Sequence, residues 1–534
     1  MSSRRTFTPN GRRSAATRRP TLSGIALAFG LGLASVSAAH ASTYRVYTAN
    51  AANAMTLNAN DGFCSLAEAV QHANGNAIYN CTDFAPGSGE QRIELLASVN
   101  RPLSTNHFVV TSPLTLNRQN VRIRIFGSGG FIDSTTYSAF VIPKGAKAFF
   151  ERVTLTNTAG SSGGRLIENY GDLSLYGVTI TKGDVTGAHH STGRGGGIFN
   201  GFTAGNPGTP AVISFAENSV ITGNKARKGG GVYNDSGIIN ELAVTISNNT
   251  ATLAGGGIYN ISNFQGAGEP PHGRINTLGL SVTGNTARAG GGIFNRAFIH
   301  LTLSTISGNS TTASGSSGET CTGSSSCDGV GGGVLNVHIS GNPNANPPIP
   351  SGSDTRFNLT ASTLSSNTAI TRGGAVYSVG VLELGGNTIN LNKAADGAAF
   401  WVTGPTDGRQ QYCNIYGSPD TGTSLINNNC VLVNGACTNG TAFFSILSGS
   451  TGGRGDFRGC QFGGRPSPTR PTYLTSSGNS SSNYCAAAIV DPNARCPQPC
   501  GGTNQTCCNT TPRCNGTMVC FEDNPGSGGY CRAP

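Results

Sequence analysis

The chain has 534 residues, of which 78 are Gly, 11% are charged and one is Trp. This composition argues against an ordinary globular enzyme and favours a repetitive chain punctuated by glycine. The formal net charge is +10, but the first 41 residues hold six Arg and no acid. The remaining 29 basic and 25 acidic residues give only +4, so no nucleic-acid partner is expected.

Residues 1–41 have the pattern of an export signal. Six arginines precede an apolar run, Leu22–Val36, and an A-x-A cleavage site follows at Ala39–Ala41. We expect a cleaved signal peptide and a secreted, outer-surface or periplasmic protein. The general secretory route is favoured over the twin-arginine route. No later stretch has the roughly 18 apolar residues of a transmembrane helix, so none is expected in the mature chain.

Residues 42–100 are predicted to form an N-terminal cap. Ser65 and Glu68 have the spacing of a capping box at the start of a short helix. A Cys64–Cys81 disulfide would pin this helix to the chain that leaves it. Apolar residues recur at helical spacing at Leu66, Ala69, Val70 and Ala73.

The same segment resembles a known family. Residues 61–70 are DGFCSLAEAV, and they are followed by Ala73-Asn74 and then Cys81. This pattern resembles the bacterial CSLREA domain, with Ala67 where the family has Arg and Val70 where it has Ile. The resemblance implies a secreted protein, because this domain typically precedes β-helical repeats.

Residues 101–400 contain two alternating motifs. The shortest unit, from Gly231 to Gly257, has 26 residues, which suits one turn of a three-sided coil. Between the copies lies a T-x-x-G-N motif, as at Thr305–Asn309. The region therefore predicts a right-handed parallel β-helix, an all-β fold. The sequence GGGxxN begins at Gly195, Gly229, Gly255, Gly290 and Gly331, with a degraded copy at Gly373.

The asparagine that ends each GGGxxN motif is predicted to be structural. In a stacked coil, an amide at a fixed turn position can bond to its counterpart one coil away, which satisfies it in the interior. We favour this ladder over ligand binding for Asn200, Asn234, Asn260, Asn295 and Asn336.

The two motifs together resemble a second family. They are similar to the GGA(I/L/V) and FxxN repeats of chlamydial polymorphic outer membrane proteins and of related surface β-helices with the pectin-lyase-like fold. This resemblance implies a solenoid that acts at the cell surface.

The cysteines divide the rest of the chain. All 16 are expected in disulfides, since none lies in the leader. Cys321 and Cys327 predict a loop-closing bridge. Residues 401–463 are predicted to end the solenoid and contain Cys413, Cys430, Cys437 and Cys460. Residues 464–482 are a predicted linker. Residues 483–534 are a predicted small cysteine-rich module, with pairing left open among Cys485, Cys496, Cys500, Cys507, Cys508, Cys514, Cys520 and Cys531.

Catalytic residues cannot be assigned from the sequence. Hydrolases of this fold carry paired carboxylate motifs, and none is found here. Asp184, His189, His190 and Arg194 come nearest to a reactive cluster, although a solvated loop is the favoured interpretation. No metal or cofactor is expected; Ca²⁺ is possible, but no motif indicates it.

The leading hypothesis for function is an adhesin-like binding protein. It would present loops and a strand face to a polysaccharide, matrix or cell-surface ligand. One alternative is a polysaccharide lyase or glycoside hydrolase, and another is a purely structural surface protein. The oligomeric state is not indicated.

Overall fold

The structure is a computed structural model of the 534-residue chain. It describes residues 42–47, 64–76, 81, 90–96, 107–118, 122–127, 131–135, 138–159, 164–187, 193–201, 210–262, 273–312, 318–322, 325–337, 355–395 and 397–403. Beyond residue 403 it describes only the backbone of short strands. Residues 1–41, predicted to be the signal peptide, lie outside the described residues.

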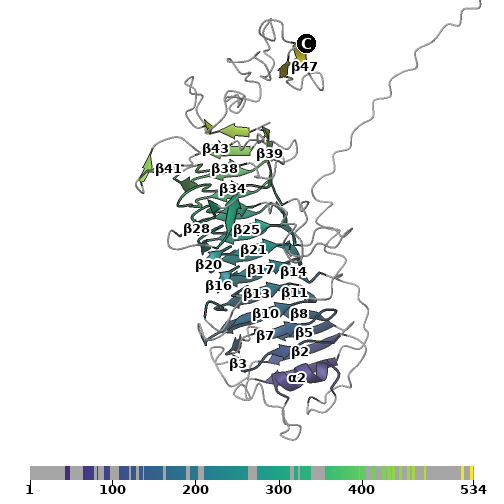
Figure 1. The fold of residues 1–534 in the computed structure, drawn as a ribbon. Helices are drawn as coiled ribbons and strands as arrows, with labels where there is room; N and C mark the ends of the chain where they lie inside the picture. Colours follow the sequence, from purple (N-terminus) through teal and green to yellow (C-terminus); the bar gives the residue numbers. More distant parts are fainter. Residues whose placement is uncertain are drawn as a thin grey trace, which may run out of the picture.

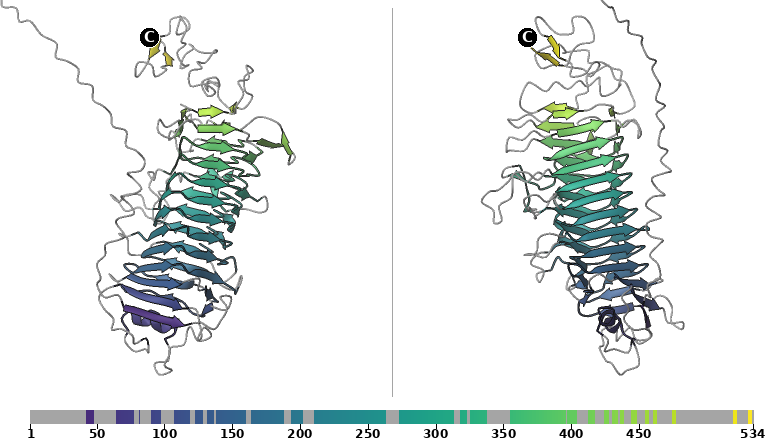
Figure 2. Two further views of the ribbon diagram at one scale, coloured as in Figure 1. Left: turned by 180° about the vertical axis from the view of Figure 1, so that it is seen from behind. Right: turned by 90° about the vertical axis from the view of Figure 1, so that its right-hand side faces the viewer.

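The chain winds into an elongated stack of coils, with the helix α2 at the N-terminal end (Figures 1 and 2). Each coil adds one strand to each of three long sheets, and all the pairings within these sheets are parallel. The all-β parallel β-helix that the sequence predicts is therefore confirmed.

Sheet A has thirteen strands. They are β1 (Ser42–Tyr47), β2 (Gln91–Leu96), β5 (Arg122–Gly127), β8 (Lys147–Glu151), β11 (Asp172–Tyr176), β14 (Val212–Ala216), β18 (Ile238–Leu242), β22 (Arg274–Leu278), β26 (Phe298–Thr302), β32 (Arg356–Thr360), β35 (Val381–Gly385), β39 (Tyr412–Tyr416) and β44 (Arg454–Asp456).

Sheet B has twelve strands and follows sheet A in each coil. They are β3 (His107–Val110), β6 (Phe131–Ser134), β9 (Thr154–Asn157), β12 (Thr179–Thr181), β15 (Val220–Thr222), β19 (Thr245–Ser247), β23 (Ser281–Thr283), β27 (Thr305–Ser307), β33 (Thr363–Ser365), β36 (Thr388–Asn390), β40 (Ser424–Asn427) and β45 (Cys460–Phe462).

Sheet C also has twelve strands and completes each coil. They are β4 (Leu114–Thr115), β7 (Ser138–Ile142), β10 (Arg165–Asn169), β13 (Ile198–Asn200), β17 (Val232–Asp235), β21 (Ile258–Ile261), β25 (Ile293–Arg296), β31 (Val334–Asn336), β34 (Val376–Ser378), β38 (Phe400–Thr403), β43 (Phe444–Leu447) and β46 (Leu474–Ser476).

Four smaller sheets lie outside this pattern. One of them, sheet D, adds a short side between sheets B and C in four coils. Its strands are β16 (Lys225–Lys228), β20 (Thr250–Ala254), β24 (Thr286–Ala287) and β28 (Ser310–Thr311). The others consist of β29 (Thr320–Thr322) with β30 (Ser325–Ser326), β37 (Lys393–Ala394) with β41 (Cys430–Val433) and β42 (Ala436–Thr438), and β47 (Val519–Phe521) with β48 (Tyr530–Arg532).

One continuous apolar core fills the coils from Tyr44 to Val402. Successive strand residues point to opposite faces, so every second side chain enters the core and the others stay outside.

The first position of each GGGxxN motif requires glycine for a structural reason. Gly255 has a φ of +65°, and an added Cβ would lie 2.4 Å from the carbonyl oxygen of Ile258.

The predicted asparagine ladder is present as a buried column of hydrogen bonds. Nδ2 of Asn200 donates to Oδ1 of Asn234 at 2.7 Å, and Asn234 donates to Asn260 at the same distance. The column continues through Asn295 to Asn336, and all five side chains are fully buried. It begins one coil earlier, at Asn169.

A second buried column is formed by the asparagines of the T-x-x-G-N motif. Each member donates through both its backbone N–H and its Nδ2 to the Oδ1 of the next member, as between Asn249 and Asn285. Because each amide is paired, its new hydrogen bonds offset the cost of removing it from water. The members are Asn224, Asn249, Asn285, Asn309, Asn367 and Asn392.

The N-terminal end of the core is covered by α2 (Leu66–Ala73). The predicted capping box is present: the Ser65 hydroxyl accepts from the backbone N–H of Glu68, whose carboxylate accepts from the backbone N–H of Ser65. The Cys64–Cys81 and Cys321–Cys327 disulfides are also present. The side chains of the later cysteines lie outside the described residues.

Candidate binding surface

The outer face of sheet A carries aligned rows of side chains. Its strands pair in register, so equivalent outward positions of successive coils stand side by side. In β22 the first, third and fifth residues are exposed and the two between them are buried. The central outward row over six coils consists of Ser174, Ser214, Asn240, Asn276, His300 and Asn358.

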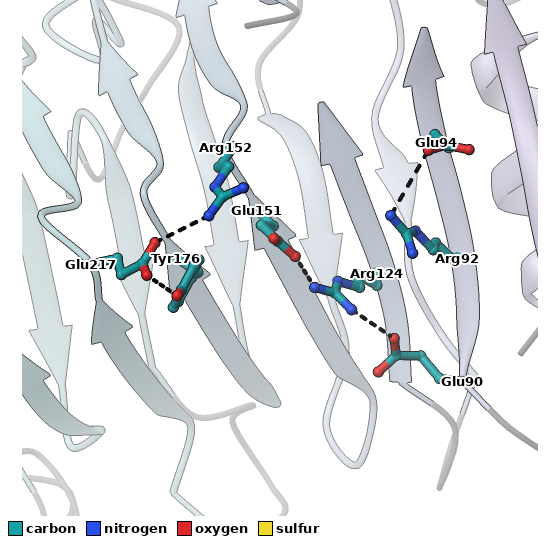
Figure 3. Close-up of polar contacts among 8 residues, drawn as sticks. All are labelled: Glu90, Arg92, Glu94, Arg124, Glu151, Arg152, Tyr176 and Glu217. Carbon is teal, nitrogen blue, oxygen red and sulfur yellow. Dashed lines mark hydrogen bonds and ion pairs between the residues drawn. The ribbon is translucent and has the colours of Figure 1, made fainter. Parts of the chain in front are cut away.

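The N-terminal part of this face is charged, and its charges are paired (Figure 3). The guanidinium of Arg124 lies 3.4 Å from the carboxylate of Glu90 and also contacts that of Glu151. The same guanidinium lies 5.0 Å from the ring centroid of Phe149. Arg92 pairs with Glu94 at 3.8 Å. Because these pairs are partly exposed, each adds little to stability and mainly fixes the arrangement of the surface.

Next to this network, Tyr176 and Arg152 both reach Glu217 (Figure 3). The Tyr176 hydroxyl donates to the Glu217 carboxylate, and this hydrogen bond raises the pKa of the phenol above its ordinary value. The tyrosine is thus the hydrogen-bond donor to the Glu217 carboxylate in this contact.

The middle of sheet A has a different character. Arg274, Phe298 and Arg356 stand in register at the first position of β22, β26 and β32. The guanidinium of Arg274 lies 5.2 Å from the ring centroid of Phe298, which holds this cation in place over an aromatic surface. The three strands contain no acidic residue. This part of the face therefore combines arginines with the neutral donors and acceptors of the central row, and the next strand, β35, adds one carboxylate, Glu383, beside Asn358.

The structure does not assemble the four residues that the sequence singled out as a reactive cluster. Asp184 is buried, and its carboxylate accepts from the backbone N–H and the hydroxyl of Thr186 in a local turn. Arg194 lies 3.6 Å from Asp235 and 5.1 Å from the Tyr233 ring centroid. His189 and His190 lie outside the described residues. The two described members thus have structural partners elsewhere.

The outer face of sheet C carries a stack of aromatic rings that the sequence analysis missed. Phe199, Tyr233, Tyr259 and Phe294 stack in adjacent coils, with centroids 4.5 to 5.6 Å apart. Their signal in the sequence is the Phe or Tyr that precedes the final Asn of GGGxxN. These rings are at most 8% exposed, so they offer no open platform to a ligand.

A segment with the Cys321–Cys327 disulfide closes over this stack. The Glu319 carboxylate lies 2.6 Å from Nζ of Lys228 and 3.0 Å from the guanidinium of Arg296, and it accepts from the Tyr259 hydroxyl at 3.0 Å. Burial raises the pKa of Tyr259 well above its ordinary value. The cluster is a contact between loop and sheet in which the Glu319 carboxylate is engaged by three side chains, which is a structural role.

Two general features of the described residues bear on function. They contain no group of three or more His, Cys, Asp or Glu side chains placed to hold a metal ion. They also contain no helix with the length and apolar character needed to span a membrane.

Comparison with known proteins adds no assignment. No family model and no curated protein matches the chain. A solved structure, the ORF18 protein of Geobacillus virus E2, is similar at 12% identity over 88% of this chain and 67% of that chain. Its TM-score is 0.21, which is too low to support an argument. The resemblances to the CSLREA domain and to polymorphic outer membrane protein repeats stay predictions.

Proposed function

We propose that this is an adhesin-like binding protein that holds an extended acidic polysaccharide along the outer face of sheet A. The observation that carries the proposal is the register of Arg274, Phe298 and Arg356 beside the central row. Arginine recognises carboxylates through two parallel hydrogen bonds, and an aromatic side chain offers an apolar surface to a sugar ring.

The spacing of these groups supports a repeating ligand. Arg274 and Arg356 are two strands apart, which corresponds to about 9.5 Å along the stack. Asn276, His300 and Asn358 stand beside them, one on each strand, at half that step. A polymer of uronic acids, with carboxylates and hydroxyls at regular intervals, is complementary to such a surface when it lies parallel to the stack.

Binding is favoured over cleavage by the placement of carboxylates. Most glycoside hydrolases use a pair of carboxyl groups on either side of the scissile bond. In the middle of sheet A, β22, β26 and β32 have none. Beside them, β35 contributes Glu383, in register with Asn358, as a single outward carboxylate and not a pair. On the N-terminal part of the sheet, Glu151 and Glu217 are engaged by Arg124 and Arg152 (Figure 3).

Export is part of the same proposal. The Cys64–Cys81 and Cys321–Cys327 disulfides are compatible with an oxidising, extracellular compartment. We propose that the protein acts outside the cell or on its outer surface, where polysaccharides are accessible.

The first test is retention of the mature chain, residues 42–534, on immobilised polygalacturonate, alginate and a neutral glucan. We expect retention on the acidic polymers that weakens as salt rises, because charge pairing is screened. The double variant Arg274→Ala/Arg356→Ala should lose this retention. The matched control Arg152→Ala, which removes an ion-paired arginine just after the sheet A strand β8, should keep it.

The same incubations distinguish binding from catalysis. Release of reducing or unsaturated ends by the wild-type chain would identify a hydrolase or lyase and overturn the proposal. Equal retention of the double variant and the wild type would show that this part of sheet A is not the binding surface.

A further inference from the structure

A second regular surface lies on sheet B, on another side of the coil. In eight successive strands, from β9 to β36, the central residue is fully buried and the residues on either side of it point outward. These outward residues form two straight files. One file is Thr154, Thr179, Val220, Thr245, Ser281, Thr305, Thr363 and Thr388; the other is Thr156, Thr181, Thr222, Ser247, Thr283, Ser307, Ser365 and Asn390.

The chemistry of the two files is nearly uniform. Val220 and Asn390 are their only members that are not Thr or Ser, and no member is charged or aromatic. Most of the members are partly exposed, whereas Thr156 and Ser247 are buried at 6% and 9% exposure. Ser247 donates to the Thr222 hydroxyl at 3.1 Å, so hydroxyls of adjacent coils in one file are close enough to bond.

This chemistry disfavours the ligands proposed for sheet A. Without a ring, the face has no surface for stacking on a sugar, and without a charge it has no means to attract an ionic polymer. It offers instead a neutral array of hydroxyl and methyl groups. Threonine side chains on a strand are stiff at χ1, so little side-chain entropy is lost when such an array meets another ordered surface.

The spacing of the array matches ordered water. Adjacent strands place the hydroxyls about 4.8 Å apart along each file. Water oxygens that are hydrogen-bonded at about 2.75 Å in a tetrahedral network have second neighbours about 4.5 Å apart. The two repeats differ by about 0.3 Å per coil, so the hydroxyls match the water lattice over stretches of about two or three coils, and the eight coils of the sheet offer several such stretches in each of the two files.

We infer that the outer face of sheet B is an ice-binding surface that adsorbs to the water lattice of an ice crystal. The occupant is ice itself, because a neutral hydroxyl array that repeats in register from coil to coil is complementary to a neutral and periodic hydrogen-bonding lattice. This activity is independent of the binding proposed for sheet A, since it uses a different sheet.

The test is ice recrystallisation in frozen sucrose and thermal hysteresis, measured with the full mature chain. The variant Thr245→Lys/Thr283→Lys places two charges in the middle of the array. The matched control Asn240→Lys/Asn276→Lys places the same charges on sheet A in the same two coils. Circular dichroism and thermal unfolding establish that each variant is folded.

We expect the wild type and the sheet A control to inhibit recrystallisation and the sheet B variant to lose most of this effect. If the lysine variant fails to fold, Thr222→Tyr/Ser307→Tyr serves instead, because tyrosine suits an exposed strand position and still breaks the flat surface. The same loss is expected.

Two results would overturn the inference. The first is no effect of the wild type on ice growth, or equal effects of the two lysine variants. The second is a wild-type dimer, seen by sedimentation, that Thr245→Lys/Thr283→Lys disrupts while ice growth is unaffected. That outcome would assign the face to self-association.

Discussion

At the scale of single residues, the outward rings of sheet C show how burial changes side-chain chemistry. Tyr377 lies in register with Trp401 of the next coil, and their rings stack with centroids 6.4 Å apart. Burial raises the pKa of Tyr377 from 10.0 to about 12. The phenol therefore stays neutral in the folded chain at a pH at which it ionises in the unfolded chain.

This shift predicts a pH dependence of stability. Between pH 10 and 12 the unfolded state releases the Tyr377 proton and the folded state retains it, so the wild type loses stability as pH rises. Tyr377→Phe keeps the ring and removes this loss, which is about 2–3 kcal/mol at the upper end. Denaturant unfolding should show a constant difference between the two proteins near neutral pH and a growing advantage of the variant above pH 10. A difference that does not change with pH would contradict this.

The roles of single residues could be predicted from the sequence where the cause of the role is local or repeats along the chain. The capping box of Ser65 and Glu68 follows from their spacing, and the roles of the GGGxxN asparagines follow from their recurrence. The stacked rings were missed although they recur as regularly. Whether an outward ring stacks on its neighbour or faces solvent depends on what covers the sheet, here Glu319 and its loop.

At the scale of elements, the buried asparagine columns connect one coil to the next. Asn285 accepts from the backbone N–H and Nδ2 of Asn249, and its Nδ2 donates to Asn309 and to the carbonyl of Ile246. One side chain therefore satisfies groups in the coils on both sides.

Replacing this asparagine should destabilise the solenoid. Asn285→Leu leaves several buried donors and acceptors without a partner, each costing about 1–3 kcal/mol. We expect a clear fall in the unfolding midpoint by calorimetry. Asn276→Leu removes an exposed amide from the same coil and should have little effect. Similar changes in both variants would mean that the column contributes nothing specific.

Coils that carry the two motifs were predicted well, and the others less so. The motifs span β13 to β34, but the coils before them lack a GGG turn and could be recognised only as short β-branched runs. Sheet D was not predicted, because its short strands read as turn sequence between the motifs. Whether such a short segment joins a sheet depends on its pairing with a neighbouring coil, as β16 pairs with β20. No local sequence pattern encodes that pairing.

At the scale of the whole molecule, the register of the coils creates surfaces that no single repeat contains. Arg274, Phe298 and Arg356 come from three coils, the last two separated in the chain by long insertions, and only stacking places them side by side. For this reason the residues that stand together on this face could not be predicted from the sequence, and the binding role itself stays a proposal. The candidate cluster around Asp184 was chosen by proximity in sequence, and the structure gives its described members other partners.

The most direct test of the proposed binding face is hydroxyl-radical footprinting of the mature chain with and without bound acidic polysaccharide. Leu242 and Leu278 stand next to each other at the edge of sheet A and are 50% and 42% exposed, whereas Leu391 follows sheet B and is 49% exposed. We expect the polysaccharide to protect Leu278 and Phe298 from oxidation and to leave Leu391 unchanged. Protection of Leu391 with no protection of Leu278 or Phe298 would contradict it.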